Sequence, residues 1–315
     1  MNAICDTFYP CKFDQTMQEA KFVPAEGAGP RPLVVCLHTW SYDQNGPYDR
    51  YAELAKIKNW HMIFPKFRGP NWLPEGCGSD SVVSDLEDAV AFVKNIAAVD
   101  PARVYLTGGS GGGHCSLLMA GRRPDLWTAV SAWCPISDIA RWHRESRERG
   151  NAYADHIESA CGGDPARSEA AMKEARLRSP LTWLPNAAGV LPVDIGAGIH
   201  DGHADGCVPV GQAIRAYNLL AAPEDRISDA DIAFIEAHEK VPPHLAAKEH
   251  DPSYGEHTVH LRKQSRLVRL TLFEGGHDIL SESAFEWLAR QVSGRAPDWS
   301  AGTAFTSFGE TALSR

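Results

Sequence analysis

The chain has 315 residues, of which 31 are lysine or arginine and 40 are aspartate or glutamate, so its formal net charge is −9. Hydrophobic residues make up 43% and charged residues 23%, which is typical of a globular protein and excludes bulk disorder. The acidic balance and the lack of a lysine and arginine cluster argue against a nucleic acid as a partner. No apolar run approaches the roughly 20 residues of a membrane helix, so no membrane partner is expected.

Short apolar runs alternate with longer helical patterns, which predicts an α/β protein with a mostly parallel sheet flanked by helices. Each predicted strand is compact and apolar, and each predicted helix carries its apolar residues on one stripe. In chain order the predicted elements are a strand at 33–38, a helix at 48–59, a strand at 61–64, a helix at 81–98, a strand at 103–107, a helix at 113–122, strands at 127–133, 190–196 and 266–273, and a helix at 283–292.

Two segments interrupt this alternation. Residues 135–190 are polar and helix-prone, and we expect them to form a helical cap insert. Residues 223–264 are rich in charge and histidine and are expected to form an irregular insert within the core, because long segments of this kind inside a domain are usually functional. The remaining parts, 1–134 and 191–315, are expected to form one α/β core.

The N-terminus has no basic segment followed by an apolar one, so a cytoplasmic location is expected, although a signal removed before residue 1 would leave the same sequence. The eight cysteines are too dilute for a disulfide framework, and no C-x-x-C pair is present. Cys36, Cys115 and Cys134 lie in apolar segments and are expected to be buried. The pairing of the other five, which are expected in loops or at edges, stays open.

Residues 108–112 read Gly-Gly-Ser-Gly-Gly, a match to G-x-S-x-G that stands between a predicted strand and a predicted helix. A nucleophilic serine needs this tight turn, and small neighbours let the turn approach the adjacent strands. Ser110 is therefore the candidate nucleophile. The competing interpretation, a glycine-rich phosphate loop, is disfavoured because no Walker lysine follows.

A serine hydroxyl needs a general base, which in this architecture follows an acid in chain order. His277 lies just past the predicted strand at 266–273, at the edge of the sheet where ligands bind in open α/β folds. The acid must orient this histidine. Asp201, close to the end of the strand at 190–196, is preferred, and Asp205 is the alternative.

The oxyanion of an acyl-transfer reaction needs two hydrogen-bond donors. The backbone amide of Gly111, the residue after the serine, is one candidate. The second comes from the loop after the first predicted strand, where Trp40 is our choice and Thr39 the alternative.

Substrate contacts are predicted from charge and aromatic rings near the same edge. Arg68 follows a strand end and offers a fork for a carboxylate or sugar hydroxyls, although an ion pair explains it equally well. Trp72 and Trp142 are candidates for stacking against a substrate, and core packing is the alternative. The segment 200–205, with two histidines and two aspartates, resembles a metal site, but no H-E-x-x-H helix accompanies it, and we predict no metal and no cofactor.

With these motifs the chain resembles the α/β-hydrolase superfamily, and within it the prolyl-oligopeptidase-like and dienelactone-hydrolase-like esterases, over most of residues 30–293. The resemblance implies a cofactor-free serine hydrolase that forms an acyl-enzyme, with the roles of nucleophile, acid and base falling on Ser110, Asp201 and His277. No β-propeller is visible and the usual His-Gly is missing from the oxyanion loop. The first departure argues against a true oligopeptidase.

We therefore expect a serine carboxylic-ester hydrolase whose substrate is a small-molecule or oligosaccharide ester, such as an acylated carbohydrate or an aryl ester. The alternative is a serine peptidase of the prolyl-oligopeptidase type that acts on short peptides. A pair of glutamates that anchors a free N-terminus would favour the peptidase, and Glu145 and Glu148 are the candidates. A homo-oligomer is compatible with the sequence.

Overall fold

The computed structural model describes residues 3–204, 206–247 and 249–304, and within these ranges the chain forms nine strands in a single sheet. The strands are β1 (Cys5–Pro10), β2 (Met17–Val23), β3 (Arg31–Leu37), β4 (His61–Pro65), β5 (Val99–Gly109), β6 (Ala129–Trp133), β7 (Val193–Gly198), β8 (Val259–Ser265) and β9 (Val268–Phe273). Their order across the sheet is β1-β2-β4-β3-β5-β6-β7-β9-β8.

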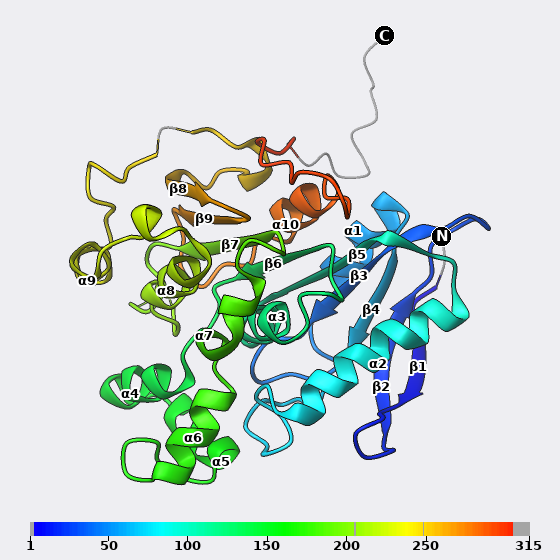
Figure 1. Ribbon diagram of the computed structural model, residues 1–315, viewed down its shortest axis with the longest axis horizontal. Helices are drawn as coiled ribbons and strands as arrows, with labels where there is room; N and C mark the ends of the chain where they lie inside the picture. Colours follow the sequence, from blue (N-terminus) through cyan, green and yellow to red (C-terminus); the bar gives the residue numbers. More distant parts are fainter. Residues whose placement is uncertain (1–2, 205, 248, 305–315) are drawn as a thin grey trace.

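The six inner strands, from β4 across to β9, run parallel, and β1, β2 and β8 add antiparallel strands at the two edges (Figure 1). The helices that accompany them are α1 (Asp49–Lys58), α2 (Asp80–Ile96), α3 (Gly111–Arg122), α4 (Ile139–Arg149), α5 (Tyr153–Cys161), α6 (Glu169–Leu177), α7 (Pro180–Trp183), α8 (Gly211–Leu220), α9 (Asp229–His238) and α10 (Ser281–Leu288). The mostly parallel, helix-flanked sheet predicted from the sequence is confirmed.

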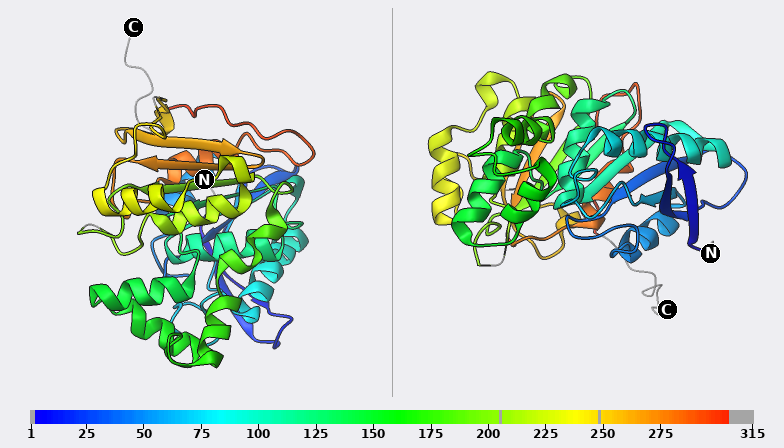
Figure 2. Two further views of the ribbon diagram at one scale, coloured as in Figure 1. Left: turned by 60° about the vertical axis from the view of Figure 1, so that its left-hand side comes forward. Right: turned by 90° about the horizontal axis from the view of Figure 1, so that it is seen from below.

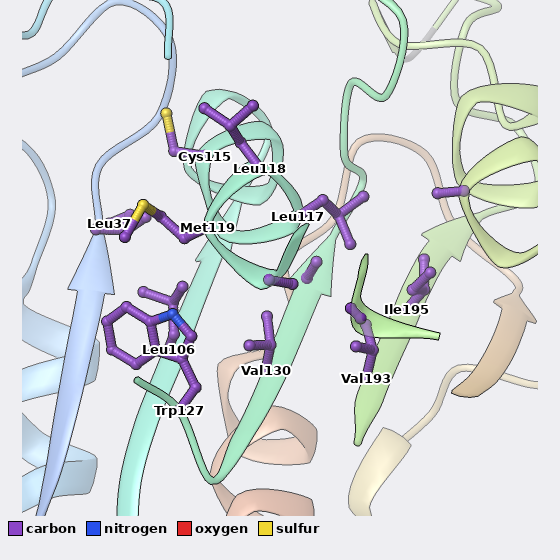
Figure 3. Close-up of a cluster of buried hydrophobic side chains, with 14 of the residues drawn as sticks. Leu37, Leu106, Cys115, Leu117, Leu118, Met119, Trp127, Val130, Val193 and Ile195 are labelled. Atoms are coloured by element: carbon purple, nitrogen blue, oxygen red, sulfur yellow. The ribbon is translucent and has the colours of Figure 1, made fainter. Parts of the chain in front are cut away.

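Both faces of the sheet are buried, as the continuous apolar runs predict. Alternate residues of β3 belong to different clusters: Leu33 and Val35 pack with α2, α3 and α8, whereas Val34 and Cys36 pack with α1 and α10. Figure 3 shows the side chains of α3, including Leu117, close to those of β5, β6 and β7. The helix that follows the glycine cluster is therefore fixed on the middle of the sheet.

The edge strands β1, β2 and β8 are the strands that the sequence analysis did not predict. In β1 only Tyr9 is buried, and β8 alternates buried Val259 and Leu261 with half-buried polar residues. The segment 223–264, expected to be irregular, thus ends in a strand that pairs with β9. Strands of this kind lack the compact apolar run by which the buried strands are found.

Residues 135–190, between β6 and β7, form α4 to α7, and α4, α5 and α6 project away from the sheet (Figures 1 and 2). A separate apolar cluster joins them to the end of β3, with Trp40 from the sheet side and Trp142 and Ile157 from α4 and α5. The insert is helical. Its apolar face is turned toward the carboxyl end of the parallel strands.

All eight cysteines carry free thiols, and Cys36, Cys115 and Cys134 are buried as expected. Cys11 and Cys77 lie in loops as expected but are buried, whereas Cys161 is buried at the end of α5. No helix in the described ranges combines the length and apolar character needed to cross a bilayer.

Candidate active site

The turn between β5 and α3 holds Ser110 alone, because the strand ends at Gly109 and the helix begins at Gly111. Ser110 has φ 57° and ψ −121°, a conformation that a residue with a side chain rarely adopts. Such strain persists only where the surroundings impose it, and here the Ser110 amide donates to the Trp133 carbonyl of β6 at 2.8 Å. The geometry is that of a nucleophile elbow.

Two glycines of this turn are required by close contacts. A Cβ on Gly109 would lie 2.2 Å from Cδ1 of Ile279, so the loop that contains His277 is packed directly on the strand that carries Ser110. A Cβ on Gly111 would lie 2.5 Å from the backbone nitrogen of Trp40. The amides of the two predicted oxyanion donors are therefore neighbours, at the start of α3.

His277 and Asp201 are joined directly: Nδ1 of His277 lies 2.7 Å from Oδ2 of Asp201. The other carboxylate oxygen, Oδ1, accepts the backbone N–H of Val208 at 3.0 Å. Asp201 is buried, so both of its oxygens are held in place. Of the two acids considered from the sequence, Asp201 is the one in contact with His277, and Asp205 lies outside the described residues.

The loops that carry the acid and the base are also fastened to each other, because β7 and β9 are neighbours in the sheet. The amide of His200 donates to the Gly275 carbonyl at 3.0 Å. The His200 ring lies between two carboxylates, with Nδ1 2.7 Å from Glu239 and Nε2 2.7 Å from Glu274. These hydrogen bonds raise the pKa of His200. Both ring nitrogens are thereby engaged within the protein, so the position of this side chain is explained without a metal.

Ser110 and His277 lie at the same end of the sheet, but in the described residues no hydrogen bond joins them. Catalytic hydrogen bonds are often long without substrate and tighten when substrate binds. The thiol of Cys134, which follows β6, lies within 4.8 Å of a ring nitrogen of His277 and donates to the Asp278 carbonyl at 3.1 Å. The side chain of Cys207, from the acid loop, is a further neighbour that affects the pKa of His277. Sequence reasoning missed both neighbours.

The electrostatic environment of His277 has opposing parts. Burial by itself lowers the pKa of the imidazole, but the hydrogen bond to Asp201, together with the neighbouring side chains of Cys134 and Cys207, outweighs it and raises the pKa above the usual value. The buried carboxylate favours the imidazolium form. Burial also raises the pKa of the Cys134 thiol to about 11, so this thiol is neutral at physiological pH.

Helix α5 brings Tyr153 to the same place. Burial is the main cause that raises the pKa of Tyr153 to about 12, and the neighbouring Cys207 is the next. The charges of His277 and Asp201 have smaller effects on the same hydroxyl. The rings of Trp40, Trp142 and Tyr153 form a compact aromatic cluster, in which Trp142 lies 4.8 Å from each of the other two centroids and Trp40 lies 6.5 Å from Tyr153. Trp142 is fully buried and Trp40 nearly so, whereas Tyr153 is half-buried, so Tyr153 is the accessible member of the cluster.

The structure places two further predicted residues differently. The guanidinium of Arg68 lies between Asp85 and Asp14, with both nearest N–O distances at 2.7 Å. Its charge is paired within the protein, as in the ion pair considered as the alternative. Arg68 is therefore not counted among the substrate-binding residues. The ring of Trp72 lies tilted against His156 of α5, with centroids 4.7 Å apart, and packs against the apolar cluster of Trp142.

A nucleophile elbow after a central parallel strand, with an aspartate–histidine pair after the later strands, defines an α/β-hydrolase. The sequence matches the prolyl oligopeptidase family over residues 75–251, more than half of the chain, and the chain belongs to this family. No curated protein matches the sequence significantly.

Solved structures similar to this chain support the same fold. Pyrococcus horikoshii acylaminoacyl peptidase matches with a TM-score of 0.65 and 13% identity, over 95% of this chain and 43% of its own. A puromycin-hydrolysing peptidase of Mycobacterium tuberculosis has a TM-score of 0.58 and 17% identity, over 93% and 40%. Oligopeptidase B of Leishmania major has a TM-score of 0.54 and 16% identity, over 72% and 31%. The chain thus spans less than half the length of each.

Proposed function

We propose that this protein is a serine peptidase that cleaves short peptides through an acyl-enzyme on Ser110. The observation that carries the proposal is the strained elbow at Ser110 on the same sheet edge as the 2.7 Å contact between His277 and Asp201. This combination supplies a nucleophile, a base and an orienting acid, which is the set that acyl transfer requires.

In the proposed reaction, Ser110 Oγ attacks the scissile carbonyl while His277 takes its proton. Asp201 holds the imidazole through Nδ1, which leaves Nε2 as the basic nitrogen, and stabilises the imidazolium that forms. The amides of Gly111 and Trp40 donate to the developing oxyanion. His277 then protonates the leaving amine, and water attacks the acyl-enzyme by the same route. No cofactor takes part in this scheme.

Family membership supports peptides as substrates better than esters, and solved structures of the same fold include an acylaminoacyl peptidase and a puromycin-hydrolysing peptidase. The accessible ring of the aromatic cluster, Tyr153, offers an apolar surface to the acyl side of a substrate, and Trp142 and Trp72 pack in the same apolar cluster.

The structure also bears on the N-terminus of the peptide. Glu145 is buried, Arg141 lies 2.7 Å from it and Gln212 donates to it at 2.8 Å. Its charge is thereby compensated, and Glu148 is exposed. The two glutamates do not form a free pair for an ammonium group. We therefore favour substrates whose N-terminus is blocked or lies away from the scissile bond.

An ester hydrolase, the function expected first from the sequence, is the second candidate. The same groups hydrolyse an ester, whose alcohol leaves more easily than an amine. Nothing in the comparisons favours an acylated carbohydrate, so the ester candidate is limited to simple acyl and aryl esters.

Matched substrates distinguish the two candidates. We would measure kcat/KM for two N-blocked dipeptide substrates that have the same acyl part and differ in the leaving group, one a 4-nitroanilide and the other a 4-nitrophenyl ester. The cleavage of unmodified short peptides would be followed by mass spectrometry. A peptidase cleaves the anilide and the peptides, and Ser110→Ala abolishes both activities. Turnover of the ester alone, with every amide untouched, would refute the peptidase and leave the esterase.

A further inference from the structure

Three side chains that are good metal ligands meet at the carboxyl ends of three neighbouring strands. Cys134 follows β6, Asp201 follows β7 and His277 follows β9, and these strands are adjacent in the sheet. One ligand atom from each lies within 4.8 Å of the other two. Catalysis by a serine triad uses the aspartate and the histidine, but it has no need for the cysteine.

The identity of the ligands indicates which cation fits. Thiolate, imidazole and carboxylate together are a ligand set of zinc, whereas magnesium and calcium prefer oxygen alone. In a tetrahedral zinc site, ligand atoms about 2.0–2.3 Å from the metal are separated by roughly 3.5 Å. The three atoms need to move by little more than an ångström to reach this spacing.

The surroundings of the cluster favour a site that is enclosed and still reachable. The side chains of Cys134 and Asp201 are 1% exposed and that of His277 is 22% exposed, so a cation would enter past the histidine. The Cys134 thiol now donates to the Asp278 carbonyl at 3.1 Å, a weak bond that is easily given up. On binding, the thiol and the imidazolium release their protons to solvent, and the cation takes their place.

We propose that Cys134, Asp201 and His277 form an inhibitory site for a thiophilic divalent cation of the zinc type. A cation there occupies a ring nitrogen of His277 and an oxygen of Asp201, and it separates the pair on which proton transfer depends. The inhibition rests on the proposed function, whereas binding of the cation does not.

The structure contains one other cluster of this kind in the described ranges, at His143, Glu158 and Asp164 in the helical insert. There the guanidinium of Arg147 also pairs with Glu158, and a fixed positive charge opposes a cation. This cluster carries no proposal, and it serves as an internal control.

The test begins with direct binding, in mildly alkaline chelator-controlled buffer. Isothermal titration of Ser110→Ala with Zn²⁺ is expected to show one tight equivalent, which Cys134→Ser loses. Cys5→Ser, which removes an exposed thiol, and His143→Gln, which removes the other cluster, are expected to bind like the parent protein. Co²⁺ added to the unmodified protein is expected to give thiolate-to-metal charge-transfer absorption, a readout that does not depend on whether a variant folds.

Inhibition is measured next, on the substrate found for the protein. Zn²⁺ is expected to inhibit reversibly with chelator, and millimolar Mg²⁺ is expected to have no effect. In Cys134→Ser the concentration for half-inhibition, normalised to the activity of that variant, should rise at least about tenfold, since loss of an outer-shell partner alone has an effect of this size.

The results separate the two proposals. Stoichiometric binding that depends on Cys134 in a protein without hydrolase activity would refute the proposed function and support the cation site. An active enzyme that binds no zinc, or that keeps its zinc sensitivity in Cys134→Ser, would overturn the cation site. Sensitivity that disappears in His143→Gln would assign the effect to the helical insert and overturn it equally.

Discussion

Replacing Asp201 with asparagine tests how the acid acts, because the structure predicts which way the new amide will turn. Oδ1 of Asp201 accepts the Val208 N–H, so the carbonyl oxygen of the asparagine stays there and its NH₂ group faces His277. An NH₂ donor forces Nδ1 of His277 to accept and moves the ring proton to Nε2. In this tautomer Nε2 has no lone pair with which to take the proton of Ser110.

The expected loss follows from this tautomer. Trapping the histidine of a serine triad in the wrong tautomer lowers kcat about 10⁴-fold, which is about 5 kcal/mol in the activation free energy. The fold should survive, because asparagine has the same shape and no charge is left unpaired by the change. Steady-state kinetics on one substrate, with thermal unfolding as the check on folding, measures the loss.

The matched control is Asp205→Asn, which changes the other acid that the sequence offered. It should retain activity within a few-fold, because Asp201 already supplies the carboxylate that His277 needs. The reasoning is refuted if Asp201→Asn keeps more than about a tenth of the activity, a far smaller loss than a wrong tautomer causes. It is refuted as well if Asp205→Asn shows the larger loss.

Three further outcomes are expected. In Gly111→Ala the new methyl group would lie 2.5 Å from the Trp40 nitrogen and displace that donor. We expect kcat to fall about 10²- to 10³-fold, with an unchanged circular dichroism spectrum. An unchanged kcat would exclude this oxyanion site. His277 must be neutral to act as the base, and its pKa is raised, so kcat/KM should increase with pH with a midpoint above the usual histidine pKa of about 6.5. A midpoint below that value would contradict the assigned environment. Asp194→Ala removes the carboxylate that lies 2.7 Å from the buried guanidinium of Arg269. The free energy of unfolding, measured in urea, should fall by about 3–5 kcal/mol. A loss below about 1 kcal/mol would show that water hydrates the guanidinium in the variant.

The sequence predicts those parts of the fold whose determinants are local. The strand at 33–38, the helix at 81–98 and the glycine-rich turn at Ser110 each carry their signal in one short stretch, and each was found close to its observed bounds. The strands β1 and β8 escaped because their stability comes from pairing with a neighbour and not from an apolar run of their own.

The site is only partly predictable for a related reason. The choice between Asp201 and Asp205 depends on the amide of Val208, which holds one carboxylate oxygen, and spacing along the chain does not reveal this contact. For Arg68 the sequence left a substrate contact and an ion pair equally open, because its partners Asp85 and Asp14 lie 17 and 54 residues away along the chain. Tyr153 belongs to an inserted helix and is close enough to His277 to be affected by its charge. Its position relative to His277 therefore depends on how that helix packs.

The central claim, that Ser110 is the nucleophile, is tested most directly by labelling the folded protein with a fluorophosphonate probe and mapping the modified peptide. We predict one adduct per chain, on Ser110, formed in parallel with the loss of hydrolysis and missing in Ser110→Ala. An active protein that forms no adduct, or that is labelled at another residue while Ser110 stays unmodified, would contradict the account.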